Sequence, residues 1–293
     1  MSTLLRGIVQ EAVALTPGMI RVVFGGDDLS GFVSAGVGDE YLRLHFPVPG
    51  TGKFVLPVES GRRWTYPAGE TPSPCQPYTV RRFEPGAGRM TIDFVVHEGG
   101  VASDWAQRAK PGDELYIGES RGLYAPPADT RWQVLVSDAT GLPALGRLVE
   151  ALPAGTRAKA IVEVAEESHV QEIASAADVE FVWLYGSGNG IAPSRLPEAV
   201  RRLALPGGPG YIWVAGESLM LRGIRAYLRH ELGLPGERYK VTGYWTHRAE
   251  EWQARFDALD DTLKARLESA WDGERDEQEV LDEVERMLEH VGL

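Results

Sequence analysis

Residues 77–82 read Pro77-Tyr78-Thr79-Val80-Arg81-Arg82, and residues 99–105 read Gly99-Gly100-Val101-Ala102-Ser103-Asp104-Trp105. Tyr, Thr and Val favour a strand, in which neighbouring side chains point to opposite faces, so Tyr78 and Thr79 would face different ways. In the second segment two glycines precede Ser103, a good N-cap, and Pro111-Gly112-Asp113 would end a helix that runs to Ala109. The two segments therefore predict a strand and, further along the chain, a short helix capped by Ser103.

Together the two segments suit a flavin dinucleotide. An aromatic ring such as Tyr78 stacks on an isoalloxazine, and the hydroxyl or amide of Thr79 hydrogen-bonds its N5 edge. Free amides at a helix start bind phosphate without a lysine, and Gly99 and Gly100 let the backbone approach an anion closely. Each segment alone is better explained as an ordinary strand or an ordinary capped helix, but their order and spacing favour the flavin.

Around these segments, residues 1–127 alternate short β-type runs with turn signals. The runs are residues 20–24, 40–46, 91–97 and 114–117, and glycine or proline turns lie at 25–26, 47–50 and 85–88. Several short strands at this spacing predict an antiparallel β-barrel.

After Pro126-Pro127 the pattern changes to apolar strands that alternate with helical segments. The expected strands are residues 133–136, 160–164, 180–184 and 211–215, and the expected helices are residues 143–152 and 218–232. This rhythm predicts a parallel sheet with helices on its faces, whose ligands bind beyond the carboxyl ends of the strands. The chain has no G-x-G-x-x-G motif. Residues 186–190, Gly-Ser-Gly-Asn-Gly, are interpreted as a flexible loop rather than a phosphate cradle, because no helix begins cleanly before Pro193.

In this order the motifs resemble the siderophore-interacting proteins, which are flavin-dependent ferric-siderophore reductases of the ferredoxin-reductase-like superfamily. The matching segments are residues 15–19, 22–29, 78–82, 93–97, 102–105, 110–113, 138–144, 213–217 and 243–245. The resemblance covers about residues 3–245. It implies an FAD-binding β-barrel domain (residues 1–127), an NAD(P)H-binding α/β domain (residues 128–246) and an acidic helical extension (residues 247–293).

The resemblance also implies the site residues. Tyr78 and Thr79 are assigned to the flavin ring as the catalytic pair. The residues implied to bind FAD are Gln76, Pro77, Tyr78, Thr79, Arg81, Val95, Val96, His97, Gly100, Val101, Ala102 and Ser103. Those implied to lie at the nicotinamide dinucleotide, or to cover the far edge of the flavin, are Asp138, Thr140, Gly216, Glu217, Tyr244 and Trp245. Three basic residues are assigned to the substrate, a bulky and often anionic ferric siderophore: Arg43, Arg121 in the loop 118–122, and Arg248. No metal ligands are expected.

The implied activity takes electrons from NADH (or NADPH) through FAD to Fe(III) and releases Fe(II) in the cytoplasm. The loop 186–190 lacks an Arg or Lys that would pair with a 2′-phosphate, which favours NADH. Three alternatives stay open. These are a flavin reductase of the same superfamily, a reductase that receives electrons from ferredoxin, and a non-catalytic siderophore-binding protein.

Composition is consistent with this interpretation. The chain has 293 residues and a formal net charge of −12. Residues 249–293 hold fifteen Asp and Glu against five Lys and Arg, so the acidity is concentrated there and argues against nucleic acid or anionic membrane as partners. No segment approaches the ~18 apolar residues of a membrane span, so a cytoplasmic protein is expected, and we expect a monomer. The single cysteine, Cys75, excludes an internal disulfide and is interpreted as a passive thiol.

The sequence departs from the family pattern at three places. Gln76 stands where an arginine commonly precedes Pro-Tyr-Thr, which removes one cation from the flavin phosphates. Residues 246–248, Thr-His-Arg, replace the usual basic residue and glycine. Beyond them, apolar residues at helical spacing around Asp272-Gly273 predict two packed amphipathic helices, in preference to a regulatory lid or a docking arm. Of the basic residues at 53, 62 and 63, Arg62 and Arg63 are interpreted as solvated surface charges.

Overall fold

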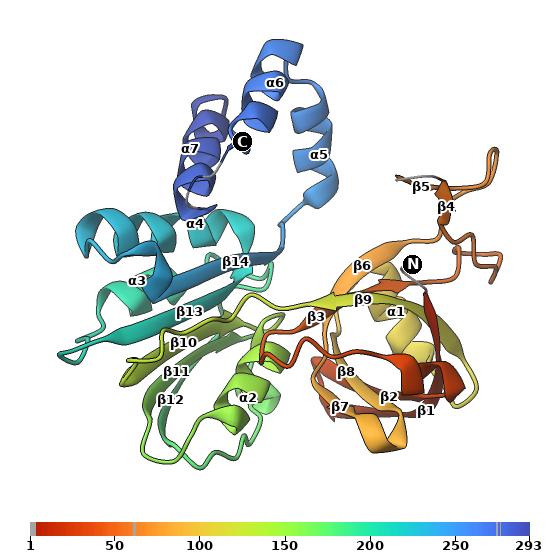
Figure 1. The fold of residues 1–293 in the computed structure, drawn as a ribbon, viewed down its shortest axis with the longest axis horizontal. Coiled ribbons are helices and arrows are strands. Elements are labelled where there is room, and N and C mark those ends of the chain that lie inside the picture. Colours follow the sequence, from red (N-terminus) through yellow and green to blue (C-terminus); the bar gives the residue numbers. More distant parts are fainter. Residues whose placement is uncertain (1–3, 61–62, 274, 276) are drawn as a thin grey trace. The chain divides into compact units, whose positions relative to one another are not determined.

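The computed structural model describes residues 4–60, 63–273, 275 and 277–293 (Figure 1). Arg62 lies outside the described residues. The chain forms two compact units. The first runs up to Tyr124 and takes in Leu142–Pro153 and Ala165–Ala176, and the second holds Ala125–Gly141, Ala154–Val164 and the chain from Ala177 onward. The domain boundaries expected at residues 127 and 246 stay predictions.

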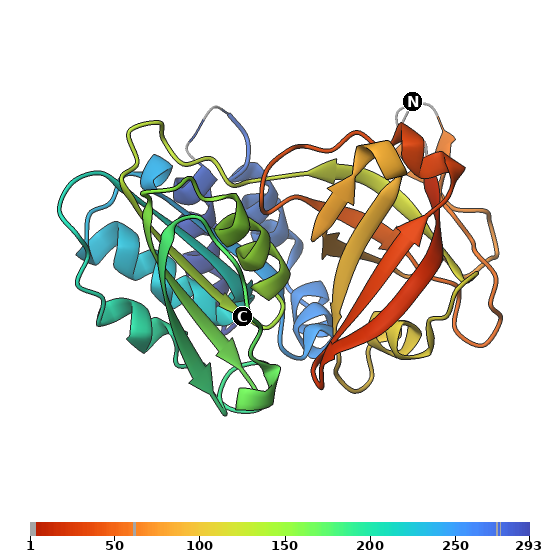
Figure 2. The same cartoon turned by 90° about the horizontal axis from the view of Figure 1, so that it is seen from below.

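Within the described residues, the first unit is built on an antiparallel sheet of seven strands (Figure 1 and Figure 2). In chain order the strands are β1 (Leu5–Thr16), β2 (Met19–Gly25), β3 (Tyr41–His45), β6 (Cys75–Thr79), β7 (Arg82–Glu84), β8 (Arg89–Val95) and β9 (Glu114–Arg121). Their order in the sheet is β6-β3-β9-β1-β2-β8-β7. The two edge strands, β6 and β7, are consecutive in the chain, with only Val80 and Arg81 between them. The sheet therefore curls until its edges meet, which gives the predicted barrel.

Alternate residues of these strands point into the barrel core. Leu42 and Leu44 of β3 are fully buried, whereas Arg43 between them is exposed. Helix α1 (Val101–Arg108) adds Trp105, whose ring packs against Phe24 and Phe46. A separate hairpin, β4 (Val58–Ser60) and β5 (Arg63–Thr65), lies outside this sheet.

The second unit is built on a parallel sheet of five strands in the described chain. They are β10 (Trp132–Asp138), β11 (Arg157–Val164), β12 (Asp178–Tyr185), β13 (Gly210–Glu217) and β14 (Tyr239–Trp245), in the order β12-β11-β10-β13-β14. Helix α3 (Leu196–Arg201) precedes β13, and α4 (Ser218–Ala226) follows it and is extended by a π-helical turn, Tyr227–Glu231. Helix α2 (Leu142–Ala151) follows β10 but belongs to the first unit. The predicted fold class, a β-barrel followed by a parallel α/β domain, is confirmed.

Four of the connections between the described strands and helices contain a short 3-10 helix. These span Asp27–Gly31, Pro85–Ala87, Glu167–His169 and Gly236–Arg238. The order of strands in the parallel sheet changes direction between β10 and β13. Strands β11 and β12 lie on one side of β10, and the later strands β13 and β14 lie on the other. This is the point at which an open α/β sheet binds its ligand.

The C-terminal extension is helical, as predicted, but its described residues form three helices rather than two: α5 (Ala249–Asp257), α6 (Asp261–Ser269) and α7 (Glu277–His290). The extra break arises at Asp260, whose carboxylate accepts a hydrogen bond of 2.9 Å from the N–H of Leu263 and so begins α6. Leu267 and Leu288 are buried in a small apolar cluster that the three helices share.

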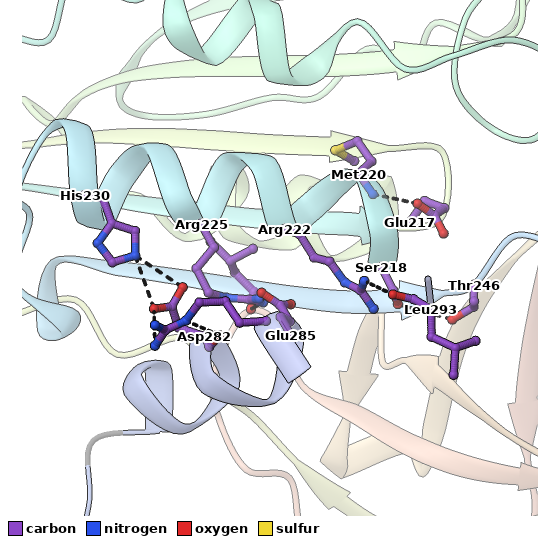
Figure 3. Close-up of polar contacts among 12 residues, drawn as sticks. Glu217, Ser218, Met220, Arg222, Arg225, His230, Thr246, Asp282, Glu285 and Leu293 are labelled. Carbon is purple, nitrogen blue, oxygen red and sulfur yellow. Dashed lines mark hydrogen bonds and ion pairs between the residues drawn. The ribbon is translucent and has the colours of Figure 1, made fainter. Parts of the chain in front are cut away.

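Helix α7 packs along α4 through polar contacts, which Figure 3 shows. Glu285 of α7 pairs with Arg225 of α4, and Asp282 lies 3.2 Å from Nε2 of His230. Arg222 also donates a hydrogen bond of 2.6 Å to the main-chain oxygen of Leu293. Acidic residues of α7 therefore face basic residues of α4 and of the π-helical turn that extends it.

Candidate functional site

Strand β6 places Tyr78 at the edge of the barrel core. Tyr78 lies opposite Leu42 of β3, and its ring centroid is 4.6 Å from that of Phe94 and 6.2 Å from that of Phe46. Burial raises the pKa of the phenol far above its usual value, so Tyr78 is a neutral hydrogen-bond donor at ordinary pH. Its hydroxyl has no hydrogen-bond partner within the part of the chain that the structure describes. Stacking of this half-buried ring on the isoalloxazine stays a prediction.

Thr79 points to the other face of the strand, as the alternation predicts. It lies opposite Tyr41 of β3, and only 6% of its surface is exposed. Among the described residues none hydrogen-bonds its hydroxyl. Most buried polar groups are paired in native proteins. The hydroxyl of Thr79 is therefore available to a ligand on this face of β6, and its contact with the flavin stays a prediction.

Two of the three predicted substrate arginines share the face that carries Thr79. Arg43 lies opposite Pro77, and Arg121 lies opposite Tyr41, so the side chains of these residues leave the same side of strands β6, β3 and β9. Both arginines are exposed. Arg121 is the last residue of β9 and not part of a loop, because the pairing of β9 with β3 continues to that position.

The remaining predicted residues of this strand have different surroundings. Gln76 is exposed and lies opposite Leu44. Arg81 is mostly buried, and its two terminal nitrogens donate hydrogen bonds of 2.7 and 2.5 Å to Glu150 of α2. Its Nε is 3.8 Å from the buried carboxylate of Asp93. Arg81 is thus engaged in ion pairs, and its assignment to the flavin phosphates stays a prediction.

Helix α1 begins three residues earlier than predicted. Gly99 adopts a left-handed conformation (φ 76°) and Gly100 an extended one, so Gly100 is the N-cap and Ser103 lies in the first turn. The expectation that Ser103 caps the helix is wrong. Instead its hydroxyl donates a hydrogen bond of 2.8 Å to the carbonyl oxygen of His97 and accepts one of 2.9 Å from the same residue's N–H.

The start of α1 fits a pyrophosphate. Within the described part of the chain no side chain caps it, so the N–H groups of Val101 and Ala102 are left for an anion. A Cβ at Gly100 would lie 2.2 Å from the imidazole ring of His97, which explains the glycine. The chain reaches this turn from the end of β8, where Val95 ends the strand and the N–H of Val96 donates to the carbonyl oxygen of Gly18.

The second unit contains a cavity of about 430 Å³ where the parallel strands end. It is lined by Asp138, Glu163, Gly188, Asn189, Gly190, Ile191, Ala192, Pro193, Ser194, Glu217, Leu219, Met220, Trp245 and His247. Of the residues assigned to the nicotinamide dinucleotide, Asp138, Glu217 and Trp245 line this cavity. The position is the one expected of a nucleotide site in an open α/β sheet.

Asp138 organises the floor of the cavity. One carboxylate oxygen accepts hydrogen bonds from the N–H and the hydroxyl of Thr140, at 2.8 and 2.6 Å. The other oxygen accepts a hydrogen bond of 2.7 Å from the indole N–H of Trp245. Burial raises the pKa of Asp138, although these hydrogen bonds act in the opposite direction. A Cβ at Gly216 would lie 2.9 Å from this carboxylate, so the glycine permits the close approach of β13.

Glu217 and Arg248 flank the same region. The Glu217 carboxylate accepts hydrogen bonds from the N–H of Met220 (2.7 Å, Figure 3) and from that of His247 (3.1 Å), so it caps α4 and fixes the turn after β14. Arg248 is exposed, with a left-handed φ of 52°, and its guanidinium is 3.5 Å from Glu251. Tyr244, also on β14, packs edge-on against Trp213 at 6.4 Å between ring centroids. Roles for Arg248 and Tyr244 at the site stay predictions.

Sequence reasoning missed Glu163, a buried carboxylate at the end of β11. It accepts hydrogen bonds from the hydroxyls of Ser187 and Ser194, both at 2.7 Å, and from the N–H of Arg195 at 2.6 Å. The loop 186–195 is therefore folded around an anion of the protein itself, which disfavours a phosphate cradle there. An acidic residue inside the apolar run 160–164 was the available signal, since buried carboxylates need several donors.

The described residues hold no cluster of three or more His, Cys, Asp or Glu side chains that could hold a metal ion. His45 and Cys75 face each other across β3 and β6, with 3.7 Å between Nε2 and Sγ. Among the described helices, none combines the length and apolar character needed to cross a membrane.

Comparison with known proteins assigns both parts of the chain. Residues 8–124 match the siderophore-interacting FAD-binding domain, and residues 130–248 match the siderophore-interacting protein domain. An NADPH-dependent ferric-chelate reductase from Escherichia coli is 31% identical over 79% of this chain and 88% of its own length. A ferric vibriobactin reductase from Vibrio cholerae is 28% identical over 80% of this chain and 86% of its own.

A solved structure supports the same assignment. The crystal structure of a siderophore utilization protein from T. fusca has a TM-score of 0.73 and 36% identity, and the match covers 85% of this chain and 94% of that one. The two family models together cover most of the chain, including β6, the start of α1 and the residues that line the cavity of the second unit. This chain therefore belongs to the siderophore-interacting protein family.

Proposed function

We propose that this chain is a flavin-dependent ferric-siderophore reductase that takes electrons from NADH or NADPH through FAD to Fe(III). In the net reaction one reduced nucleotide is oxidised, two Fe(III) become Fe(II), and one proton is released. Oxygen-rich chelators hold Fe(II) more weakly than Fe(III), so reduction frees the metal. The names of the relatives from E. coli and V. cholerae, both ferric reductases, support this proposal.

The observation that carries the proposal is the outer face of β6, β3 and β9. In the segment that matches an FAD-binding domain, this face carries Thr79, whose hydroxyl has no hydrogen-bond partner among the described residues, together with the exposed Arg43 and Arg121. Tyr78 and Thr79 would hold the flavin ring, and the amides of the first turn of α1 would hold the pyrophosphate. Bound FAD supplies the chemistry that a nicotinamide donor and a one-electron iron acceptor both need.

The arginines would recognise the substrate by charge. Carboxylate, catecholate or hydroxamate chelates of Fe(III) are bulky and often anionic, and arginine attracts them without competing for iron. Arg248, in the second unit, is proposed as a third member of this basic set.

The cavity at the carboxyl ends of β10, β11, β13 and β14 would take the nicotinamide dinucleotide. Three carboxylates, Asp138, Glu163 and Glu217, line it, and the described lining residues include no Lys or Arg. The lack of a basic partner among these described lining residues disfavours a 2′-phosphate, so NADH is the proposed donor, whereas the relative from E. coli is named as NADPH-dependent. We further propose that the chain acts as a monomer in the cytoplasm.

The proposal is tested by the absorption spectrum of the purified protein. A stoichiometric flavin band should bleach anaerobically with NADH and return when a ferric siderophore is added, while an Fe(II) chelator reports the product. A protein that cannot be loaded with FAD would refute the proposal. Bleaching only by reduced ferredoxin would replace the donor, and recovery by free flavin but not by ferric siderophore would replace the acceptor.

The substrate face is tested with Arg43→Ala and Arg121→Ala. Each substitution should raise the KM for an anionic ferric siderophore about fivefold to tenfold, because each removes one attractive charge of roughly 1 kcal/mol, and bleaching by NADH should be unchanged. Arg157→Ala is the control, since Arg157 is an exposed arginine at the amino end of β11. An equal effect of all three substitutions would show that net charge alone matters.

A further inference from the structure

The edge strands β6 and β7 of the barrel are linked by Val80 and Arg81, which directly follow Thr79. We call this two-residue link the join. Among the described strands β6 pairs only with β3 and β7 only with β8, so the two residues between them are not part of a continuous ladder. Their amides are bound separately: the N–H of Val80 donates to the carbonyl oxygen of Glu40 (2.8 Å), and that of Arg81 donates to the carbonyl oxygen of Thr91 (3.0 Å). The carbonyl oxygen of Val80 has a separate support.

Arg147 of helix α2 provides that support. Its Nη1 donates hydrogen bonds to the carbonyl oxygen of Val80 at 2.7 Å and to the carboxylate of Glu40 at 2.9 Å. Glu40 is fully buried and also accepts hydrogen bonds from Ser34 and Ala35, each at 2.6 Å. Burial opposes the ionisation of Glu40, but the hydrogen bonds outweigh it and lower the pKa of the carboxyl. Glu40 is therefore an anion that holds Arg147 in place.

One turn further along α2, Glu150 binds the next residue of the join. Its carboxylate accepts two hydrogen bonds from Arg81, as described above. Arg147 and Glu150 are three positions apart and therefore lie on one face of the helix. That face binds the carbonyl group of Val80 and the guanidinium of Arg81. Behind them Asp93 is held by two hydrogen bonds of 2.7 Å from Arg21.

We propose that Arg147 is a positioning residue for the flavin, which it affects through Val80 and Thr79 without touching the cofactor. On one side Thr79 is fixed by its pairing with Tyr41. On the other side the main chain is held by Arg147, so Arg147 sets where the Thr79 hydroxyl and amide meet the N5 edge of the ring. This inference rests on the proposed function, because it assumes that Thr79 contacts the flavin.

The test combines hydrogen exchange on the FAD-free full-length protein with FAD titration. Arg147→Met keeps the length of the side chain and removes its donors. Amides of residues 79–81 should exchange at least tenfold faster, and the Kd for FAD should rise about tenfold, which is the lower range for loss of one charge-assisted hydrogen bond. Arg147→Lys keeps the positive charge and N–H donors but not the planar guanidinium, and should restore part of both effects. The absorption band of bound FAD should shift in the Met variant and return toward its wild-type position in the Lys variant.

Arg225→Met is the matched control. Arg225 is also buried, pairs with Glu285 and donates a hydrogen bond of 3.2 Å to a main-chain carbonyl oxygen, that of Val241. It should leave exchange at residues 79–81, the Kd for FAD and the flavin spectrum unchanged. If Arg147→Met does not fold, Glu150→Gln, which alters only the half-exposed partner of Arg81, should give faster exchange at Arg81 and a twofold to threefold rise in Kd.

The outcomes separate this inference from the proposed function. Wild-type protein that does not bind FAD would refute the proposed function and with it the flavin part of the inference. Wild-type protein that binds FAD, with a folded Arg147→Met or Glu150→Gln variant whose Kd and spectrum are unchanged, would refute the inference alone. Exchange that rises equally throughout the first unit would also refute it, because Arg147 would then act only on general stability.

Discussion

Replacing Trp245 by Phe should weaken the protein more at high pH than at low pH. The indole N–H of Trp245 is the donor to the outer oxygen of the buried Asp138 carboxylate, at 2.7 Å. Burial raises the pKa of Asp138, so folding binds a proton and wild-type stability falls as the pH rises from the ordinary value of 3.8 through the folded pKa. Without the indole donor, the charged form of Asp138 loses more stabilisation than the protonated form, so the pKa of Asp138 in the folded protein rises further.

The magnitude follows from the charge of the acceptor. A hydrogen bond to a neutral acid contributes about 0.5–1.5 kcal/mol and one to a carboxylate about 1.5–3 kcal/mol. The loss in free energy of unfolding should therefore be about 1 kcal/mol larger at pH 8 than at pH 4. Urea unfolding followed by far-ultraviolet circular dichroism measures it without relying on tryptophan emission.

Trp132→Phe serves as the control for lost packing. Its indole N–H donates to a neutral acceptor, the carbonyl oxygen of Gly208, at 3.2 Å, so its loss in stability should be the same at both pH values. If Trp245→Phe lowered the free energy of unfolding by the same amount at pH 4 and pH 8, the indole would not be bonded to an ionised Asp138, which would refute the prediction.

Three further predictions concern other contacts. Burial lowers the pKa of His45, so stability should fall as the pH drops below 6.5, and His45→Phe should flatten this slope in urea titrations; an unchanged slope would exclude His45 as its source. Ser103→Ala removes both hydrogen bonds to His97 and should lower the free energy of unfolding of the FAD-free protein by about 1–2 kcal/mol. An unchanged free energy of unfolding would mean that the turn before α1 does not depend on these hydrogen bonds. Glu285→Gln leaves the buried Arg225 without its ion-pair partner and should cost about 2–3 kcal/mol by thermal unfolding, and a change below 0.5 kcal/mol would contradict that role.

Much of the fold is predictable from the sequence, because local patterns encode it. The apolar runs 133–136, 160–164 and 211–215 all lie within parallel strands, and the change of rhythm after Pro126-Pro127 marks the change of sheet type. Strand β1 gave a weaker signal. Its pairing with β2 shifts register at two places, so its buried and exposed residues do not alternate regularly.

The candidate site is only partly predictable, because several of its residues act through distant partners. Tyr78 and Thr79 can be recognised from their own types and spacing. Glu40 and Arg147 bind each other across 107 positions of the chain, and each resembles an ordinary surface charge in the sequence. Ser103 was assigned the wrong role for a related reason, since the conformations of Gly99 and Gly100 decide where the helix begins.

The polar seam between α4 and α7 determines which parts of this chain can be exchanged with those of a relative. The family model ends at residue 248, but Arg222 and Arg225 of α4 bind Leu293 and Glu285, which lie beyond it. A chimera that joins this α/β unit to a relative's shorter end would leave a guanidinium buried with its charge unbalanced. Helix α4 and the C-terminal helices therefore have to be exchanged as one block.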